Sequence, residues 1–421
     1  MDKSLYRKRV VDEIIEQYLQ VFGAVCIEGP KWCGKTWTAE KHSNSVFYVG
    51  DPEGNFQNRE LAKLNPTLVL KGEQPRTIDE WQEVPSLWDA VRFYVDQSSK
   101  KGQFILTGSA TPPQKGVLHS GTGRIATLRM MPMSLYESGD SSAIVSLKSL
   151  CNGIMESQLL EEVSLKNIAH LILRGGWPAS IGLSTKNAVL VPQMYLDNVI
   201  KEDVDKIDLR TRNKSKMWLL LRSLARAEST TMGKRKLKED MATVEKDTID
   251  EETIDEYLQL FSQLFILENQ KPFSTSLRSS LRIKQAEKRH FTDPSFACSL
   301  LGITNEEQLI GDLQTFGFLF ESLCIRDLNI YAQTFGGKVF HYQDYQNDEI
   351  DAVIELPDGS WCAFEIKLGA HQIDEAANKL IRINKKFNKP AKVLCVISAL
   401  SNAAYKREDG VFVIPITSLA P

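Results

Sequence analysis

Apolar residues in the first part of the chain form short runs, and the segments between most of these runs have helical spacing. The runs lie at 24–27, 46–49, 77–78, 104–106 and 125–130. Residues 1–22 are predicted to form a helix with an apolar stripe, and residues 88–97 a second helix. Strands that alternate with helices predict a parallel sheet covered on both faces, ending near residue 138.

Two regions with other patterns follow. Residues 156–226 have mostly helical spacing, which is interrupted at Gly175-Gly176-Trp177-Pro178, and residues 250–262 form a strongly amphipathic helix. From residue 309 a second α/β unit is predicted, with helices at 309–329 and 373–387 and strands at 339–342, 349–356, 361–368, 393–397 and 411–416. We therefore predict four regions, which are residues 1–150, 151–215, 216–285 and 286–421.

Composition adds limits to this picture. The 421 residues are 42% hydrophobic and 25% charged, which is ordinary for a globular protein of two or three domains. A net charge of −3 gives no overall attraction to nucleic acid. The seven cysteines form no C-x-x-C pair, so neither a zinc site nor a disulfide framework is expected. The charged start of the chain is unlike a signal peptide and no apolar stretch could span a bilayer, so we expect a cytoplasmic protein without a membrane partner.

The segment after the first predicted strand has the spacing of a phosphate-binding loop. It fits G-x-x-x-x-G-K-[ST] and consists of Gly29, Pro30, Lys31, Trp32, Cys33, Gly34, Lys35 and Thr36. Glycines let such a loop curl so that its N–H groups face phosphate oxygens, and the start of the next helix adds positive potential. Lys35 is expected to reach the β- and γ-phosphates and Thr36 to bind Mg²⁺, so ATP and Mg²⁺ are the predicted cofactors.

Polar residues at the ends of two other predicted strands favour the same chemistry. Asp79 ends the strand 76–78 and is placed to hold Mg²⁺ through water, while Glu80 is placed to polarise an attacking water. The alternative is that this acidic pair only caps the next helix. After the strand at 104–106, Thr107 or Ser109 is a candidate sensor of the γ-phosphate, and the alternative there is a simple turn.

These motifs, in this order, resemble the bacterial and archaeal AAA-type ATPases that carry a characteristic C-terminal domain of unknown function. Besides the loop, the matching blocks are Ile78-Asp79-Glu80, Val84-Pro85, Leu106 to Ser109, Gly123-Arg124, Pro132 to Glu137 and Gly175 to Pro178. The resemblance covers nearly the whole chain and implies an ATPase, so an enzyme. One departure is that the strand before Asp79 is short and polar, which bears on turnover more than on binding.

The same resemblance assigns a role to Arg124. It implies that this arginine contacts nucleotide, within one subunit or from a neighbouring one, where it would offset charge on the transferring phosphoryl group. The alternative is a surface arginine at the start of a strand. A homo-oligomer is therefore among the predicted partners.

Residues 216–285 resemble the winged-helix region of this family, with 250–262 as the recognition helix. Basic residues lie nearby and would suit DNA phosphates: Arg210, Arg212, Lys214, Lys216, Lys234, Arg235, Lys236, Lys238, Arg278, Arg282, Lys284, Lys288 and Arg289. The proposed recognition helix, however, is rich in acids that would repel a phosphate backbone. A helical packing module with solvated charges is the alternative.

A hairpin near the C-terminus holds a second group of polar residues. Pro357-Asp358-Gly359 suits a three-residue loop, which places Asp351 opposite Glu365, with Lys367 on the same face. Ile350, Ala352, Ile354, Cys362, Phe364, Ile366 and Leu368 are predicted to fill the other face as core. Two adjacent carboxylates favour a divalent metal between them, and Lys367 could steady a phosphate or a water.

The pattern of Asp351 followed by Glu365-x-Lys367 resembles the PD-(D/E)xK nucleases, a restriction-endonuclease-like fold, and Glu321 matches a helix glutamate that some members add as a metal ligand. The alternative is an amphipathic hairpin whose polar face is exposed to water. The predicted fold is thus α/β: a P-loop NTPase sheet with a helical extension, a winged-helix-like middle segment and a nuclease-like C-terminal domain.

Three functions remain open from the sequence. The leading one is an ATPase whose nucleotide state is read by the nuclease-like domain, with DNA as a predicted partner. The second is a metal-dependent DNA nuclease regulated by ATP. The third is a partner-binding protein that keeps nucleotide as a structural ligand without catalysis.

Overall fold

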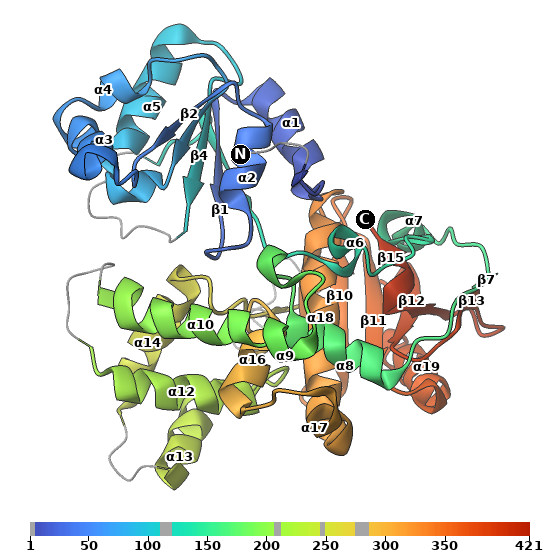
Figure 1. Ribbon diagram of the computed structural model, residues 1–421. Helices are drawn as coiled ribbons and strands as arrows, with labels where there is room; N and C mark the ends of the chain where they lie inside the picture. The colour runs from blue at the N-terminus through green and yellow to red at the C-terminus, as the bar shows by residue number, and fades with distance from the viewer. Residues whose placement is uncertain (1–4, 110–119, 206–211, 245–248, 274–285) are drawn as a thin grey trace. The chain divides into compact units, whose positions relative to one another are not determined.

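The computed structural model describes residues 5–109, 120–205, 212–244, 249–273 and 286–421 (Figure 1). The chain divides into two compact units. The N-terminal unit consists of Met1–Pro132, Glu202–Arg212 and Leu260–Ile266, and the C-terminal unit of Met133–Lys201, Asn213–Gln259 and Leu267–Pro421. We describe each unit by itself.

A five-stranded parallel sheet forms the centre of the N-terminal unit. Its strands are β1 (Ala24–Glu28), β2 (Ser45–Tyr48), β3 (Arg76–Asp79), β4 (Phe104–Gly108) and β5 (Ile125–Arg129), in the order β2-β3-β4-β1-β5. Every neighbouring pair is parallel. The five strands predicted from the apolar runs are confirmed, and β1 lies between β4 and β5 in the interior of the sheet.

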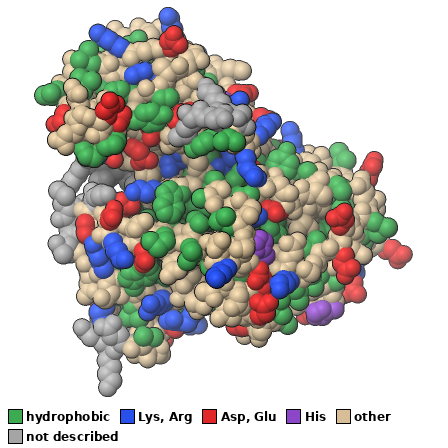
Figure 2. All heavy atoms as spheres, in the orientation of Figure 1, with side chains coloured by type: hydrophobic (Ala, Val, Ile, Leu, Met, Phe, Trp, Pro, Cys, Tyr) green, Lys and Arg blue, Asp and Glu red, His purple; other side chains and the backbone are tan. Residues whose placement is uncertain are grey.

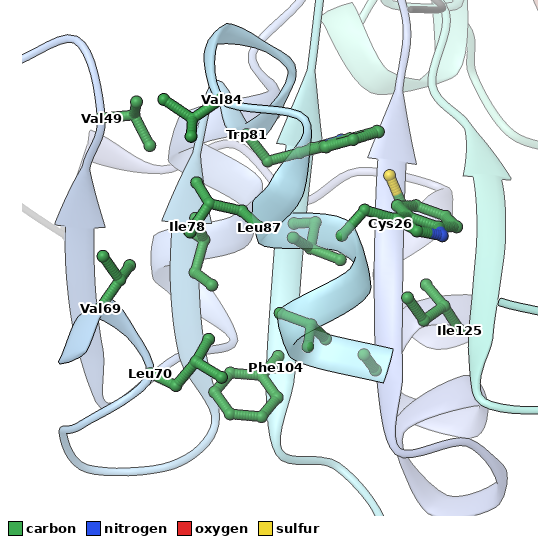
Figure 3. Packing of buried hydrophobic residues seen from close by; sticks show 14 of the residues in the cluster. Cys26, Val49, Val69, Leu70, Ile78, Trp81, Val84, Leu87, Phe104 and Ile125 are labelled. Carbon is green, nitrogen blue, oxygen red and sulfur yellow. The ribbon is translucent and has the colours of Figure 1, made fainter. Parts of the chain in front are cut away.

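Helices cover both faces of this sheet, because its central strands are apolar on both sides. The helices are α1 (Val11–Val21), α2 (Lys35–Lys41), α3 (Glu53–Leu64), α4 (Pro66–Val69) and α5 (Ser86–Ser98), and a 3₁₀ turn, η2 (Trp81–Glu83), precedes α5. One face packs Ile78 and Phe104 against Leu70, Trp81 and Leu87 (Figure 3). The other packs Val25, Ile27 and Ile105 against residues of α1 and α2.

The predicted helix at 1–22 starts later than expected. Helix α1 begins at Val11, and residues 6–9 run without helical structure. Their side chains make tertiary contacts instead: the Tyr6 hydroxyl donates to Asp12 Oδ1 over 2.6 Å, and the buried Arg9 reaches backbone carbonyls elsewhere in the unit. The apolar stripe of the sequence could not reveal those contacts.

The middle of the chain is helical, as predicted. Its elements are α6 (Leu135–Ser138), β6 (Val145–Ser146), α7 (Leu147–Cys151), β7 (Gln158–Leu159), α8 (Leu165–Arg174), η3 (Pro178–Ser180), α9 (Thr185–Ala188), α10 (Leu190–Asn198), η4 (Val199–Asp203), α12 (Lys214–Arg226), α13 (Lys234–Val244), α14 (Glu251–Gln263), α16 (Pro294–Leu301) and α17 (Glu306–Gly311). The predicted break follows α8, where Gly176 N donates to Asp293 and a Cβ on Gly176 would lie 2.1 Å from Met133 O.

The C-terminal part is built on a mixed sheet of eight strands, in the order β7-β13-β14-β12-β11-β10-β9-β8. Beside β7, its strands are β8 (Lys271–Pro272), β9 (Lys338–Gln343), β10 (Glu349–Glu355), β11 (Trp361–Lys367), β12 (Val393–Ser398), β13 (Ala403–Lys406) and β14 (Phe412–Pro415). Helices α18 (Leu313–Gln333) and α19 (Ile373–Asn384), with the turns η5 (Ala370–Gln372) and η6 (Ile416–Ser418), complete it, and β15 (Leu419–Ala420) pairs with β6. The helix predicted at 309–329 is in fact two helices, because Asp312 caps the start of α18 by accepting a hydrogen bond from Thr315 N.

The hairpin of β10 and β11 has the predicted register. Ala352 lies opposite Phe364, and Ile354 opposite Cys362. Gly359 takes a left-handed conformation in the loop, with a φ of 77°. The alternative of a polar face open to water is wrong, because α19 packs on the side of Val353 and Ala363, and Glu365 is fully buried.

All seven cysteines are free and buried, as their scatter through apolar runs predicted. Among the described residues, no helix combines the length and apolarity that a bilayer span requires. On the face shown in Figure 2, basic and acidic side chains are interspersed. That distribution agrees with the small net charge of −3 and gives this face no broad field of one sign.

Candidate functional site

The predicted phosphate loop joins an interior strand to the start of a helix. The loop follows β1, which ends at Glu28, and α2 begins at Lys35, the residue after Gly34. Gly34 has a φ of 103°, which a residue with a side chain rarely adopts. A Cβ on Gly29 would lie 2.0 Å from Met130 O, so only glycine fits there. Both glycines of the motif are thus required by the path of the backbone.

The motif ends in two polar residues: the side chain of Lys35 points into the loop, and that of Thr36 points toward β3. Lys35 is buried, and its Nζ donates to Pro30 O over 2.8 Å, so the ammonium group is held inside the loop. Thr36 Oγ1 donates to Asp79 Oδ1 over 2.8 Å. The structure therefore brings together Lys35, Thr36 and Asp79, which the sequence had placed in one site.

Asp79 lies at the centre of a hydroxyl network at the carboxyl ends of β3 and β4. Thr107 Oγ1 donates to Asp79 Oδ1 over 2.7 Å and accepts from Glu80 N over 3.0 Å. Burial raises the pKa of Asp79, and the nearby Glu80 raises it further, while the hydroxyls of Thr107 and Thr36 and the charge of Lys35 act in the opposite direction. Within the described part of the chain, no ammonium or guanidinium group forms an ion pair with Asp79.

Glu80 is held beside this network in a strained conformation. Its φ is 57°, a value that costs free energy in a residue with a side chain. Ser109 Oγ donates to Glu80 Oε2 over 2.7 Å, and the amide of Gln82 donates to the same oxygen. Both predicted sensors are therefore present at the site, Thr107 on Asp79 and Ser109 on Glu80. The carboxylate and hydroxyl oxygens gathered here are ligands that Mg²⁺ prefers, so the residues fit that ion.

The other loop residues contact the rest of the N-terminal unit. Lys31 Nζ forms an ion pair with Asp203 at 2.7 Å. Cys33 is fully buried with its Sγ 3.7 Å from Met130 O, and Pro30 is buried too. Trp32 is half-exposed and has a φ of 61°. The loop is thus anchored on both sides of an exposed tip.

Arg9 is a site residue that sequence reasoning missed. Its guanidinium donates to Cys33 O over 2.6 Å and to Met131 O over 2.8 Å, and the residue is almost fully buried. It therefore ties the phosphate loop to the segment after β5. No local pattern could have indicated this contact, because the partners lie 24 and 122 positions away.

Arg124 is not brought to the loop within one chain. It precedes β5, and Ala24 N at the start of β1 donates to its carbonyl, so it lies at the amino edge of the parallel sheet. The phosphate loop leaves the carboxyl edge, about 16 Å away along five residues of strand. The Arg124 side chain instead forms an ion pair with Asp96 of α5 at 2.6 Å.

The second predicted group gathers in the C-terminal unit. Lys367 Nζ lies 2.7 Å from Glu365 Oε1 and 3.4 Å from Asp351 Oδ2. Glu321 on α18 is connected to this group by Lys288, whose Nζ lies 2.5 Å from Glu321 Oε1. The sequence had assigned Lys288 to a basic edge for DNA. Glu321 and Lys367 also line a cavity of about 820 Å³ beside η5. The four predicted residues are thus neighbours, and Lys288 is a further member of the group that the sequence did not place there.

The basic residues expected to line a DNA-binding edge are partly neutralised. Lys234 pairs with Asp255 of α14 at 2.5 Å, Arg235 pairs with Glu239 at 3.0 Å, and Lys216 and Lys288 are buried. Arg210, Arg278, Arg282 and Lys284 lie outside the described residues. Helices α12, α13 and α14 are observed in this segment, while its winged-helix likeness remains a prediction.

Comparison with protein families assigns the parts of the chain separately. Residues 22–139 match the model described as an AAA domain. Residues 165–307 match a domain of unknown function, DUF8612, and residues 316–419 match another, DUF4143. The AAA match spans the five-stranded sheet, the phosphate loop and Asp79.

The chain is also similar to whole proteins. Uncharacterized proteins of Mycobacterium tuberculosis and Mycobacterium bovis are each 22% identical over 349 residues, which covers 82% of this chain and 70% of theirs. A Walker-type ATPase of Pyrococcus abyssi is similar at 12% identity, covers 69% of this chain and 94% of its own, and has a TM-score of 0.42. The chain joins an AAA-type P-loop ATPase domain to two domains of unknown function.

Proposed function

We propose that the chain binds ATP at Gly29–Thr36 and hydrolyses it with Mg²⁺. The observation that supports this most is the 2.8 Å hydrogen bond from Thr36 Oγ1 to Asp79 Oδ1. It joins the end of the phosphate loop to the acid of a neighbouring strand, so two oxygen donors for one metal ion are already in contact. A helix cap formed by Asp79 would not need this partner.

The side chains have distinct roles in the proposed reaction. Bound Mg-ATP supplies the electrophilic phosphorus and the cation that neutralises charge on the phosphates. Lys35 leaves Pro30 O and donates to the phosphates, because a charged acceptor binds an ammonium more strongly than a carbonyl does. Thr36 and Asp79 hold the cation, directly or through water.

Glu80 is the proposed base that orients and polarises the attacking water. Hydrogen bonds from Ser109 and Gln82 fix its carboxylate, and its backbone N–H is held by Thr107 Oγ1. A base held by several donors keeps one orientation, which is what positioning a water requires. Thr107 touches both Asp79 and Glu80, so it links metal binding to the base.

For Arg124 we propose action across a subunit interface. Its position at the amino edge of the sheet separates it from the loop of its own chain, and its side chain is half-exposed. A homo-oligomer would therefore be the active form. Mixing Arg124→Ala chains with Lys35→Ala chains tests this: restored hydrolysis supports the transfer of Arg124 between subunits, and two inactive populations that stay inactive argue against it.

The other functions predicted from the sequence have less support. DNA remains a predicted partner, but the observed pairing of Lys234 and Arg235 with acids does not favour it. A metal-dependent nuclease requires carboxylates that are open to a divalent ion, and those of the C-terminal unit already contact lysines. Binding of nucleotide without turnover is the alternative that the site geometry itself permits.

Phosphate release from ATP is the experiment that tests the proposal. We expect Mg²⁺-dependent release by the wild type and a loss of at least about 100-fold in Lys35→Ala, since a positioned charge on the transferring group has that effect. Lys41→Ala is the matched control, because Lys41 is an exposed lysine at the other end of α2. If ATP raises the melting temperature but no phosphate is released, nucleotide is only a structural ligand.

A further inference from the structure

The C-terminal unit gathers seven charged side chains in one cluster, of which Lys288, Glu321, Asp351 and Glu365 are buried and the other three are partly exposed. Its four carboxylates are Glu321 of α18, Glu349 and Asp351 of β10 and Glu365 of β11, and its three lysines are Lys288, Lys367 of β11 and Lys379 of α19. Burying a single charge without a partner is very costly, so each member of such a cluster must be neutralised by another. The arrangement of the pairs shows which groups do this.

Lys288 is the central cation of one half of the cluster. Its side chain is only 2% exposed, and its Nζ lies 2.5 Å from Glu321 Oε1, 2.6 Å from Glu349 Oε1 and 3.9 Å from Asp351 Oδ1. Two backbone hydrogen bonds with Gln270, both of 2.9 Å, fix the position of the residue. The ammonium therefore sits among three carboxylates that come from a helix and a strand.

Glu365 and Asp351 form the other half with two more lysines. Glu365 Oε1 lies 2.6 Å from Lys379 Nζ and 2.7 Å from Lys367 Nζ. Asp351 Oδ2 accepts from Ile366 N over 2.8 Å and lies 3.4 Å from Lys367 Nζ. Burial opposes ionisation of Asp351, yet Lys367 and Lys288 lower its pKa, so this carboxylate stays charged inside the protein.

Nearby histidines do not change this balance. Burial, followed by the charge of Lys288, lowers the pKa of His290 and of His341 to about 3. Both imidazoles are therefore neutral near pH 7. The positive charge of the cluster therefore comes from its lysines. Burial alone would lower the pKa of Lys288 and of Lys367, but the surrounding carboxylates have the larger effect and raise both pKa values.

The arrangement does not fit the divalent metal that a nuclease-like pattern implies. Such an ion needs several oxygen ligands at about 2.1–2.5 Å, all directed at one point. Here the carboxylate oxygens are directed at ammonium groups, and within the described ranges no three side chains of His, Cys, Asp or Glu are placed to hold a metal. Two buried oxygens of the cluster accept no hydrogen bond, Glu321 Oε1 and Glu365 Oε2. Glu321 Oε1 lies 2.5 Å from Lys288 Nζ, so Glu365 Oε2 alone is left as a ligand, and a divalent ion needs several.

We propose that Lys288 is a built-in cation that occupies the place of a divalent ion, so that the Asp351, Glu365 and Lys367 pattern of this chain forms a metal-independent ion cluster. The inference does not depend on the ATPase proposal. It predicts that the cluster needs no Mg²⁺ for its structure, and that any ligand of the adjoining 820 Å³ cavity meets Lys367 rather than a metal ion.

Binding of Mn²⁺, followed by electron paramagnetic resonance, tests this proposal on the full-length chain without nucleotide. All proteins carry Asp79→Asn, which removes the metal ligand of the phosphate site. We expect no binding to this parent at concentrations that saturate the Lys288→Met variant, because only the variant has three carboxylates around a vacated cation position. Adding Asp351→Asn to Lys288→Met should abolish the gain.

Two results would overturn the proposal. The first is Mn²⁺ binding by the Lys288-containing parent that disappears with Glu321→Gln or Asp351→Asn, which would establish a metal site in the native cluster. The second is a folded Lys288→Met variant that binds no Mn²⁺, which would show that the ammonium does not hold a cation's position. If Lys288→Met does not fold, Mn²⁺ binding by the Lys288-containing parent still tests the proposal, because the proposal requires that this protein binds no Mn²⁺ in its C-terminal cluster.

Discussion

The phosphate site and the C-terminal ion cluster both place an aspartate on a strand of a buried sheet, but they neutralise it in opposite ways. Asp79 is surrounded by the hydroxyls of Thr36 and Thr107, and burial raises its pKa. Asp351 is more deeply buried than Asp79, but Lys367 and Lys288 overcome the effect of burial and lower its pKa. Asp79 feels the charge of Lys35 but forms no ion pair within the described residues, whereas Asp351 lies within 4 Å of two lysine ammonium groups.

The difference indicates how each region obtains its positive charge. Hydroxyl donors stabilise a carboxylate less than an ammonium does, so a site built from them gains most when a metal ion enters with a ligand. A cluster with its own lysines gains nothing from a metal and would have to lose a lysine to bind one. The N-terminal unit is thus suited to a changing ligand and the C-terminal cluster to a permanent structure.

The largest expected effect concerns Glu80. Glu80→Gln should lower the rate of ATP hydrolysis about 1000-fold while ATP binding persists, because it removes the base and leaves the loop intact. Phosphate release and ATP binding by calorimetry measure the two quantities. Glu83→Gln is the control, since Glu83 belongs to the same turn but pairs with Arg59. A similar loss in both variants would mean that the turn, and not the base, is what matters.

Removing the built-in cation should have the next largest effect. Lys288→Ala leaves Glu321, Glu349 and Asp351 without their shared partner and should lower the free energy of unfolding by about 3 kcal/mol. Lys379→Ala should cost less, because that side chain is 28% exposed and Glu365 keeps Lys367. Urea unfolding of both variants measures the difference. Equal losses would contradict a special role for Lys288.

The smallest effect is a dependence of Mg²⁺ binding on pH. Because burial raises the pKa of Asp79, its carboxylate takes up a proton at a higher pH than an ordinary aspartate, near 4, would. Protonation of Asp79 competes with metal binding, so the Mg²⁺ concentration for half-maximal hydrolysis should rise as the pH falls. This rise should begin at a pH above the ordinary pKa of an aspartate. Kinetics over a pH series measure this.

The sign of this pH effect is reversed for the metal-free protein. A carboxyl group whose pKa is raised by folding binds its proton more tightly in the folded state. The folded state therefore loses stability as the pH rises from the pKa of this group in the unfolded protein to its pKa in the folded protein. Acidification over that interval should therefore stabilise the free protein and weaken Mg²⁺ binding. A half-maximal Mg²⁺ concentration that stays constant over the whole interval would show that Asp79 is not a ligand.

Local patterns in the sequence predicted the strands and several of the contacts. The five strands of the N-terminal sheet, the position of the phosphate loop and the register of the β10–β11 hairpin follow from short-range periodicity and turn residues. The contact of Thr36 with Asp79 follows too, because carboxyl ends of parallel strands meet at one edge.

What the sequence did not predict depends on contacts between distant segments. Arg9 and Lys288 look like ordinary charged residues of polar stretches, and both are buried by partners far along the chain. The polar face of the hairpin suggested exposure to water or a metal site, because alternation alone does not reveal a covering helix such as α19. Arg124 was placed near nucleotide by resemblance, whereas the strand direction puts it at the opposite edge.

The most direct test of the central claim is the number of Mn²⁺ ions that the wild-type chain binds with and without ATP. We predict that Mn²⁺ binds only together with ATP, and that this binding disappears in Thr36→Ala while Asp351→Asn leaves it unchanged. Binding without ATP that is lost in Asp351→Asn would contradict the account, because it would place the metal in the C-terminal cluster and not at the phosphate loop.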